Sequence, residues 1–392
     1  SIATGKRAHE HGILGFVQPN AAQNEVEPVQ ASNRKQKTFW NILNEAGQKT
    51  QVVNWWPSYP VEQLNGAMVS NQFCTWPEDL KNWPLEKGHV FPDALRQEVA
   101  ELRMHPSELT LAHLRPFFPE LDLNAFESDE IVAQATAILA KCASVNNVVT
   151  QLLEEEEWDT AAVYYEAIDH FSHLAMKYHP PQLSEVTDDE FAKYHFIVEA
   201  AYRLHDLFLG TYIESQPEAN TFLISDHGFR SGEERWTALP NHAGAPALEH
   251  QFYGIFVAKG PQIPALEQLS GLTLLDIAPM VLATHNLKAL PEMAGHLPAY
   301  WPSPIQEVVL SSTPQLVEQR HSPQMEKELL DALVKLGYLD AQDREQGGAR
   351  LLENGYYLAR SLRAQQRPRE AWQVLQSLEL GPGSPIRYLL LG

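Results

Sequence analysis

An acid and a histidine stand side by side where a short apolar run ends, in residues 221–229 (TFLISDHGF). The apolar residues 221–225 predict a short buried strand, so Asp226 and His227 lie at its carboxyl end. Neighbouring side chains of a strand point to opposite faces, so both can reach one metal ion only where the strand has broken into a loop. Gly228 permits such a break.

The segments on either side of this run alternate between strand-like and helix-like patterns. The predicted strands are residues 51–56, 66–69, 161–168 and 254–258, and the predicted helices are residues 41–47, 128–157, 189–215 and 274–282. This alternation predicts an α/β fold in which helices flank a mostly parallel sheet. Ligands of such sheets bind at the carboxyl ends of the strands, which is where the motif at 226–227 begins.

The chain of 392 residues is longer than a single hydrophobic core usually supports. We expect one α/β domain over residues 1–310 and a helical tail over residues 311–392. Residues 72–125 carry six prolines among short helical pieces. This pattern predicts an inserted cap region over a site rather than a part of the sheet.

The tail carries two candidate helical features. Residues 329–338 predict a helix that ends at Gly337 in the manner of a C-cap. Residues 354–378 have the spacing of one tetratricopeptide-like helix pair, and an ordinary helical hairpin fits a single copy equally well. A tail of this kind could bind a protein partner.

Composition and charge exclude several classes of function. The net charge is −21, from 29 Lys and Arg against 50 Asp and Glu, so a nucleic acid polymer is not the expected partner. The only cysteines, Cys74 and Cys142, provide neither a disulfide framework nor a thiolate metal site. No run of about 18 apolar residues predicts a membrane segment in this chain, and the compartment stays open.

Two further motifs carry metal-ligand chemistry. In residues 168–173 (IDHFSH), Asp169 and His173 leave a predicted strand end, and their spacing lets both turn toward one ion. In residues 249–256 (EHQFYGIF), His250 stands just before a predicted strand, and His242 is a rival for the same role. The three motifs, each at a strand boundary, occur in the order expected for a hydrolase with two metal ions.

Together the motifs resemble the alkaline phosphatase superfamily, in particular its type I phosphodiesterase and nucleotide pyrophosphatase branch. The resemblance runs from Ser1 to about Leu297. It includes residues 3–13 (ATGKRAHEHGI), which are similar to the threonine-glycine turn and the histidine-glycine-isoleucine of the family. Residues 274–279 (LLDIAP) and 291–295 (PEMAG) resemble the helix and loop that follow the last ligand.

This resemblance implies a set of five metal ligands in the chain. One zinc ion would be held by Asp169, His173 and His250, and a second by Asp226 and His227. Zinc is the best guess for both ions, although manganese or iron accepts the same ligands.

The resemblance also implies that the nucleophile is a threonine or serine upstream of Ser1, together with one more aspartate ligand. The catalytic residue is therefore unknown within this chain, and Ser1 and Thr4 are interpreted as turn residues. Phe16 stands where many relatives carry an asparagine that contacts phosphate. An N-terminal truncation of this kind removes a central strand, so we expect exposed strand edges and low stability.

The implied activity is hydrolysis of a phosphodiester or phosphomonoester, with a small phosphate ester, such as a nucleotide, as the substrate. A sulfatase would need a Cys-x-Pro-x-Arg segment, which neither cysteine provides. The alternative is a non-catalytic, truncated relative that acts as a binding module. Retention of all five ligands favours the enzyme, because buried acids and histidines cost stability when no metal offsets them.

Overall fold

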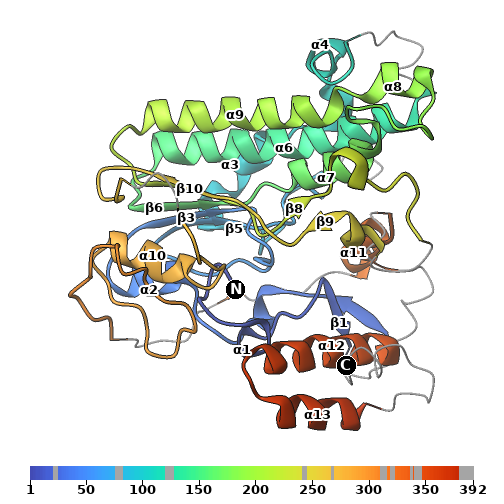
Figure 1. Cartoon of the computed structure of the whole chain (residues 1–392). Helices are drawn as coiled ribbons and strands as arrows, with labels where there is room; N and C mark the ends of the chain where they lie inside the picture. The colour runs from blue at the N-terminus through green and yellow to red at the C-terminus, as the bar shows by residue number, and fades with distance from the viewer. Residues whose placement is uncertain are drawn as a thin grey trace. The chain divides into compact units, whose positions relative to one another are not determined.

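The computed structural model describes residues 1–20, 25–75, 83–119, 128–240, 245–265, 269–309, 316–317, 323–335, 339 and 347–378 (Figure 1). The chain forms two compact units. The site unit, as we call it, comprises residues 47–241 and 245–265, and the terminal unit comprises residues 1–46, 242–244 and 266–392. All five predicted ligands lie in the site unit.

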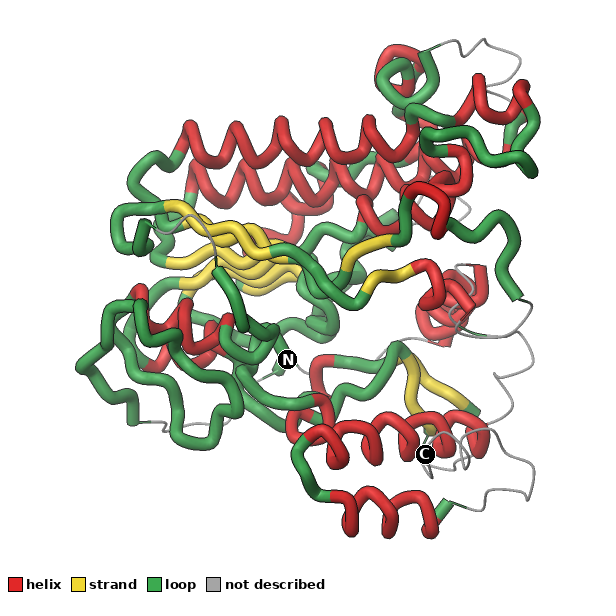
Figure 2. The backbone as a smooth tube through the Cα atoms, viewed as in Figure 1, coloured by secondary structure: helices red, strands yellow, loops and turns green. Residues whose placement is uncertain are grey.

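A four-stranded sheet with the order β5-β4-β3-β6 runs through the site unit (Figure 2). Its strands are β3 (Thr50–Val53), β4 (Gly66–Val69), β5 (Val90–Phe91) and β6 (Thr160–Val163). β3 is parallel to both β4 and β6, and all four of its residues are buried, as expected of a central parallel strand. β5 is antiparallel to β4, so the sheet is mixed.

The inserted region contributes to this sheet. β5 lies within residues 72–125, so the prediction that this segment stays outside the sheet is wrong for that piece, because the chain returns to pair with Val69. The described remainder holds α3 (Arg96–Glu101) and α4 (Leu111–Leu114). Residues 76–82 and 120–127 lie outside the described residues, and a capping role stays a prediction.

β7 (Thr221–Ile224) and β10 (Phe256–Lys259) form a separate antiparallel pair. The prediction of parallel pairing is wrong here. Parallel strands need a crossover connection, usually a helix, whereas the described connection doubles back through β8 (Gly228–Phe229) and β9 (His250–Gln251). β6 pairs only with β3 among the described strands, which leaves one of its edges open. The predicted low stability stays a prediction.

Helices α6 (Glu130–Glu155), α7 (Ala167–Ala175) and α9 (Ile197–Ser215) pack on one another, and α6 also contacts β3 (Figure 1). The Asp129 side chain caps α6 by accepting hydrogen bonds from two backbone amides of its first turn. The helix predicted at 128–157 is therefore confirmed. The helix predicted at 189–215 is two helices, α8 (Asp188–Tyr194) and α9, which are separated by a turn at His195 and Phe196.

The terminal unit combines both ends of the described chain. It contains α1 (Ala8–His11), the antiparallel pair β1 (Val17–Pro19) and β2 (Val26–Pro28), α2 (Phe39–Glu45), α10 (Ile277–Thr284), α11 (Pro323–Lys335), α12 (Gly347–Ala364) and α13 (Pro368–Ser377). His9 Nδ1 lies 2.8 Å from Ser361 Oγ, so α12 packs against the N-terminal segment. The division at residue 310 stays a prediction.

The tail contains one packed helix pair. α12 and α13 bury Ala359, Leu362, Ala371 and Leu375 against each other. A single pair is equally compatible with a tetratricopeptide-like unit and a helical hairpin. Gly337 lies outside the described residues. Among the described helices, none is long and apolar enough to cross a bilayer.

Candidate metal centre

Helix α7 delivers the first acid and histidine. Asp169 and His173 are four residues apart and therefore lie on one face of the helix, with Asp169 Oδ1 3.4 Å from His173 Nε2. The prediction that a strand extends to Ile168 is wrong, since β6 ends at Val163 and α7 begins at Ala167. Asp169 and His173 can thus face one ion because they are one turn apart on helix α7.

The β8–β9 ladder delivers the other histidines. His250 opens β9 opposite Phe229 of β8, and Asp226 and His227 lie in the loop just before β8. The His227 and His250 rings are stacked, with centroids 3.8 Å apart and planes 13° apart. The two ligand-bearing segments therefore lie directly against each other.

Two glycines allow this close approach. A Cβ on Gly254 would lie 1.9 Å from the Ser225 carbonyl oxygen, and a Cβ on Gly228 would lie 2.7 Å from the Tyr253 carbonyl oxygen. The predicted break of the strand at Asp226 and His227 is confirmed, and Gly228 is the first residue of β8 directly after it. The break occurs at residues 225–227, and both glycines are needed for backbone proximity.

The structure brings all five predicted ligands together. Oδ1 of Asp169 lies 3.3 Å from His250 Nε2 and 3.9 Å from His227 Nε2, while Nε2 of His173 and Nε2 of His250 are 3.0 Å apart. Asp226 Oδ1 lies 3.8 Å from His227 Nε2. One ligand atom each from Asp169, His227 and His250 lies within 4.8 Å of the others, a spacing that could hold a metal ion.

Distances favour His173 over His227 as the third partner of Asp169 and His250. Zinc lies about 2.0 to 2.1 Å from nitrogen and oxygen ligands, so tetrahedral ligand atoms are about 3.3 Å apart. The Asp169, His173 and His250 atoms are separated by 3.0 to 3.4 Å. His227 lies farther from Asp169, at 3.9 Å. The donor set of one carboxylate and two imidazoles fits zinc, and also manganese or iron.

Electrostatics of the cluster favour a negative carboxylate beside charged imidazole. Burial disfavours ionised Asp169, yet hydrogen bonds from His173 and His250 hold the pKa of its carboxyl well below the usual range. Burial likewise disfavours charged His173, yet hydrogen bonds with Asp169 and Glu249 raise the pKa of its imidazole to about 9. Metal binding must therefore displace the proton on Nε2 of His173.

Sequence reasoning missed Glu249. Its Oε2 atom lies 2.7 Å from His173 Nδ1, and the residue is only 8% exposed. An acid before a histidine is common, and His173 is 76 positions away in the chain. No local signal could have indicated this pair. The rival His242 lies outside the described residues.

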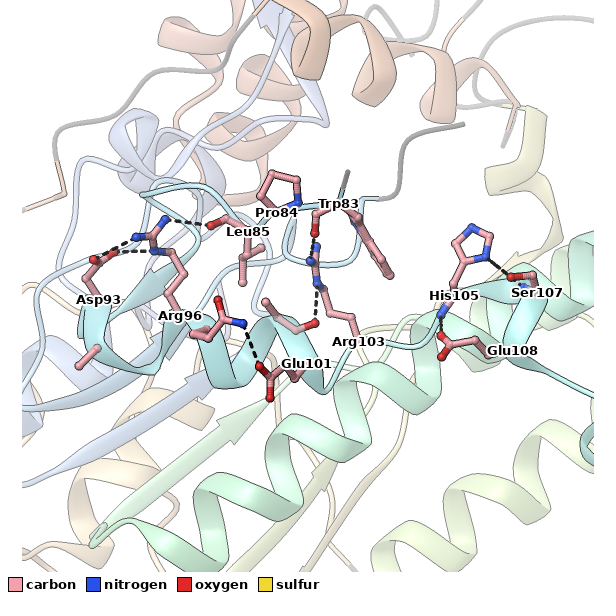
Figure 3. A pocket seen from close by; sticks show the side chains of 13 residues that line it. Trp83, Pro84, Leu85, Asp93, Arg96, Glu101, Arg103, His105, Ser107 and Glu108 are labelled. Atoms are coloured by element: carbon pink, nitrogen blue, oxygen red, sulfur yellow. Dashed lines mark hydrogen bonds and ion pairs between the residues drawn. The ribbon is translucent and has the colours of Figure 1, made fainter. Parts of the chain in front are cut away.

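A cavity of about 590 Å³ lies elsewhere in the site unit (Figure 3). It is lined by residues between Trp83 and Glu108 and by none of the five predicted ligands. Its two arginines already have partners. Arg96 forms an ion pair with Asp93. Arg103 Cζ lies 3.9 Å from the centroid of the Trp83 ring, and its guanidinium donates a hydrogen bond to the Trp83 carbonyl. This cavity is therefore distinct from the metal centre.

Comparison with known proteins completes the description of the centre. No curated protein and no solved structure matches the chain. Residues 1–264 match a family model described as type I phosphodiesterase / nucleotide pyrophosphatase, and this stretch includes all five predicted ligands. The match covers more than half of the 392 residues and confirms the resemblance to this branch of the alkaline phosphatase superfamily. The chain therefore belongs to the type I phosphodiesterase / nucleotide pyrophosphatase family.

Proposed function

We propose that this protein hydrolyses phosphoester bonds of small molecules with two divalent metal ions bound at the Asp169 cluster. The observation that carries the proposal is the triangle of Asp169 Oδ1, His173 Nε2 and His250 Nε2, with sides of 3.0 to 3.4 Å. Family membership supports the reaction class, because the matching family model is described as type I phosphodiesterase / nucleotide pyrophosphatase.

The ligands divide into two groups in this proposal. Asp169, His173 and His250 hold the first ion, and Asp226 and His227 contribute to the second. Zinc is the proposed metal, because carboxylate and imidazole together suit it. The second group supplies only two ligands, so the other positions around that ion are filled by water, substrate or further residues.

Bound divalent ions would supply positive charge to the transferred phosphoryl group and would lower the pKa of the attacking hydroxyl. The protein orients this site. Phe229 packs its ring against His173 and His250, at centroid distances of 4.9 and 5.6 Å, and shields one side of the cluster from water. The His227 ring stacks on the His250 ring, so a ligand of the second ion lies against a ligand of the first.

We further propose that the nucleophile is a threonine or serine upstream of Ser1. Thr4 is assigned to a turn rather than to the nucleophile. It is buried, and its Oγ1 accepts a hydrogen bond from the Lys6 amide. A nucleotide-like ester is the proposed substrate, since the net charge of −21 disfavours a polyanionic polymer.

A protein partner for α12 and α13 is proposed on the exposed Trp372 ring.

The test combines metal content with hydrolysis of bis(p-nitrophenyl) phosphate and of p-nitrophenyl phosphate. Both are measured on residues 1–392 and on a chain that also includes the residues encoded upstream of Ser1. Bound zinc in both chains, with diester hydrolysis only in the longer one, is the expected result. Absence of metal and of activity from both chains would favour the binding-module alternative.

A further inference from the structure

The His173 ring is held from two sides by groups that belong to the β8–β9 segment. Glu249 Oε2 lies 2.7 Å from Nδ1, and the Phe229 ring meets the imidazole edge-on at 75°. Asp169 and His250 face the opposite nitrogen, Nε2, at 3.4 and 3.0 Å. The two nitrogens of one ring thus have separate partners.

We propose that Glu249 is a positioning residue of the metal centre, which keeps the proton of His173 on Nδ1 so that Nε2 presents its lone pair to the first ion. This inference rests on the proposed function, because it concerns the same ion. It assigns a role to a residue that the predicted ligand set does not contain.

Glu249 is well placed for this role because its backbone is fixed. Its carbonyl oxygen accepts a hydrogen bond from the Arg230 amide at 2.7 Å, directly after β8. The preceding carbonyl, of Leu248, accepts from Arg230 Nε at 2.8 Å and from Trp236 Nε1 at 3.2 Å. The carboxylate therefore extends from an anchored backbone, and the 8% exposure of the residue limits competition from water.

The same peptide links two ligands of the first ion. Residue 250 provides a ligand nitrogen, and residue 249 orients the ligand on α7. A shift of β9 relative to α7 would disturb both contacts at once. Glu249 thus couples the helix that carries Asp169 and His173 to the hairpin that carries His250.

The chemistry follows from the tautomers of imidazole. In a neutral imidazole one nitrogen carries the proton and the other can bind a metal ion. A hydrogen-bond acceptor beside one nitrogen keeps the proton there and leaves the other nitrogen free for the metal. A carboxylate on Nδ1–H also makes Nε2 a stronger donor to the ion. Removal of such an outer partner typically weakens metal affinity by about 10-fold to 100-fold.

Direct coordination by Glu249 does not fit the geometry. Its bonded oxygen faces Nδ1, whereas the other ligand atoms gather around Nε2 on the far side of the ring. The imidazole therefore separates Glu249 from the ion position. Its contribution is made through His173.

The experiment measures Zn²⁺ affinity by competition with a chromophoric chelator for the wild type, Glu249→Gln and Glu249→Leu. Glu214→Gln serves as the matched control, because Glu214 is an exposed glutamate on α9, away from the β8–β9 segment. The expected result is about 10-fold to 100-fold weaker Zn²⁺ binding in both Glu249 variants and an unchanged affinity in the control.

A second readout separates positioning from a loss of fold. Nitrogen NMR of the Zn²⁺-loaded protein reports which nitrogen of His173 carries the proton, and Co²⁺ absorption reports the coordination geometry. We expect a protonated Nδ1 in the wild type and a changed Co²⁺ spectrum in Glu249→Leu. The far-UV circular dichroism of the metal-free Glu249→Gln protein should match that of the wild type, which shows that the fold is retained.

The outcomes distinguish the two proposals. If the wild type binds Zn²⁺ and both Glu249 variants bind it as tightly, the positioning role is overturned and the proposed function stands. If the wild type binds no Zn²⁺, the proposed function fails and the positioning role fails with it. Weaker binding in the variants, with the control unchanged, supports both.

Discussion

The two halves of the cluster differ in how well the protein holds them. His173 and His250 have side chains only 11% and 18% exposed, and each has a hydrogen-bonded or stacked partner. Asp226, in contrast, is 53% exposed and stands in a loop, 3.8 Å from His227. The first half is oriented before any ion arrives, whereas the second half gains its geometry when further ligands join it. We therefore expect the first ion to bind more tightly than the second.

The largest effect is expected from Asp169→Asn, because Oδ1 of Asp169 is the atom around which three histidines gather. The variant should lose the first ion, and phosphoester hydrolysis should fall by more than about 100-fold, beyond the typical effect of an outer partner. It should also lose the stabilisation by Zn²⁺, which is about 2.7 kcal/mol for the wild type at 100 times the Kd. Thermal unfolding with and without Zn²⁺ measures this difference.

Asp206→Asn is the matched control for that variant, since Asp206 is an exposed aspartate on α9 outside the cluster. It should keep the Zn²⁺-dependent rise of the midpoint. An Asp169→Asn protein that still gained as much stability from Zn²⁺ as the control would show that the cluster is not the metal site.

A smaller effect on metal content is expected from Asp226→Asn. Because Asp226 belongs only to the exposed half, the variant should keep the first ion and lose the second, so that metal content falls from about two ions to about one. Elemental analysis after dialysis against trace Zn²⁺ measures the content. Loss of both ions would show that the halves are not independent, and retention of both would remove Asp226 from the ligand set.

The smallest effect is expected outside the cluster, at His205 on α9. Burial lowers the pKa of His205 below the ordinary value of 6.5, although its ring hydrogen-bonds to the Ala201 carbonyl. The unfolded chain therefore binds a proton more readily, and the stability contributed by neutral His205 is present above pH 6.5 and is lost as pH falls through and below that value. His205→Gln should lose less stability between pH 7.5 and pH 5.5.

Urea unfolding at both pH values, with chelator present, isolates this contribution from the metal centre. The difference between wild type and His205→Gln over this range should be at most about 1.4 kcal/mol, because pH 5.5 lies one unit below the ordinary histidine pKa of 6.5. Equal pH dependence in the two proteins would show that His205 does not contribute to the acid sensitivity.

Much of the candidate site could be predicted because its motifs are local. Asp226 and His227 are adjacent, and Asp169 and His173 are one helix turn apart, so short spacings place each pair together in any compact fold. The same locality explains the confirmed helix at 128–157, whose apolar stripe and Asp129 cap lie within one segment. The family resemblance added the grouping of these pairs around shared ions.

Other features depend on contacts between distant residues and could not be predicted. Residues 161–168 are compatible with a strand throughout, whereas in the structure α7 begins at Ala167 and Phe171 of this helix packs against Phe117 in the core. The parallel pairing predicted for β10 and β7 was wrong, because a short buried strand has the same sequence pattern in either orientation.

The sequence by itself determined the candidate ligands and their order along the chain, since those depend on residue type and local spacing. Only the tertiary structure decided that α7 carries the first pair, that Gly228 and Gly254 bring two backbones together, and that Glu249 contacts His173. These contacts join residues up to 76 positions apart, and they form because burial of the surrounding apolar side chains brings the segments together.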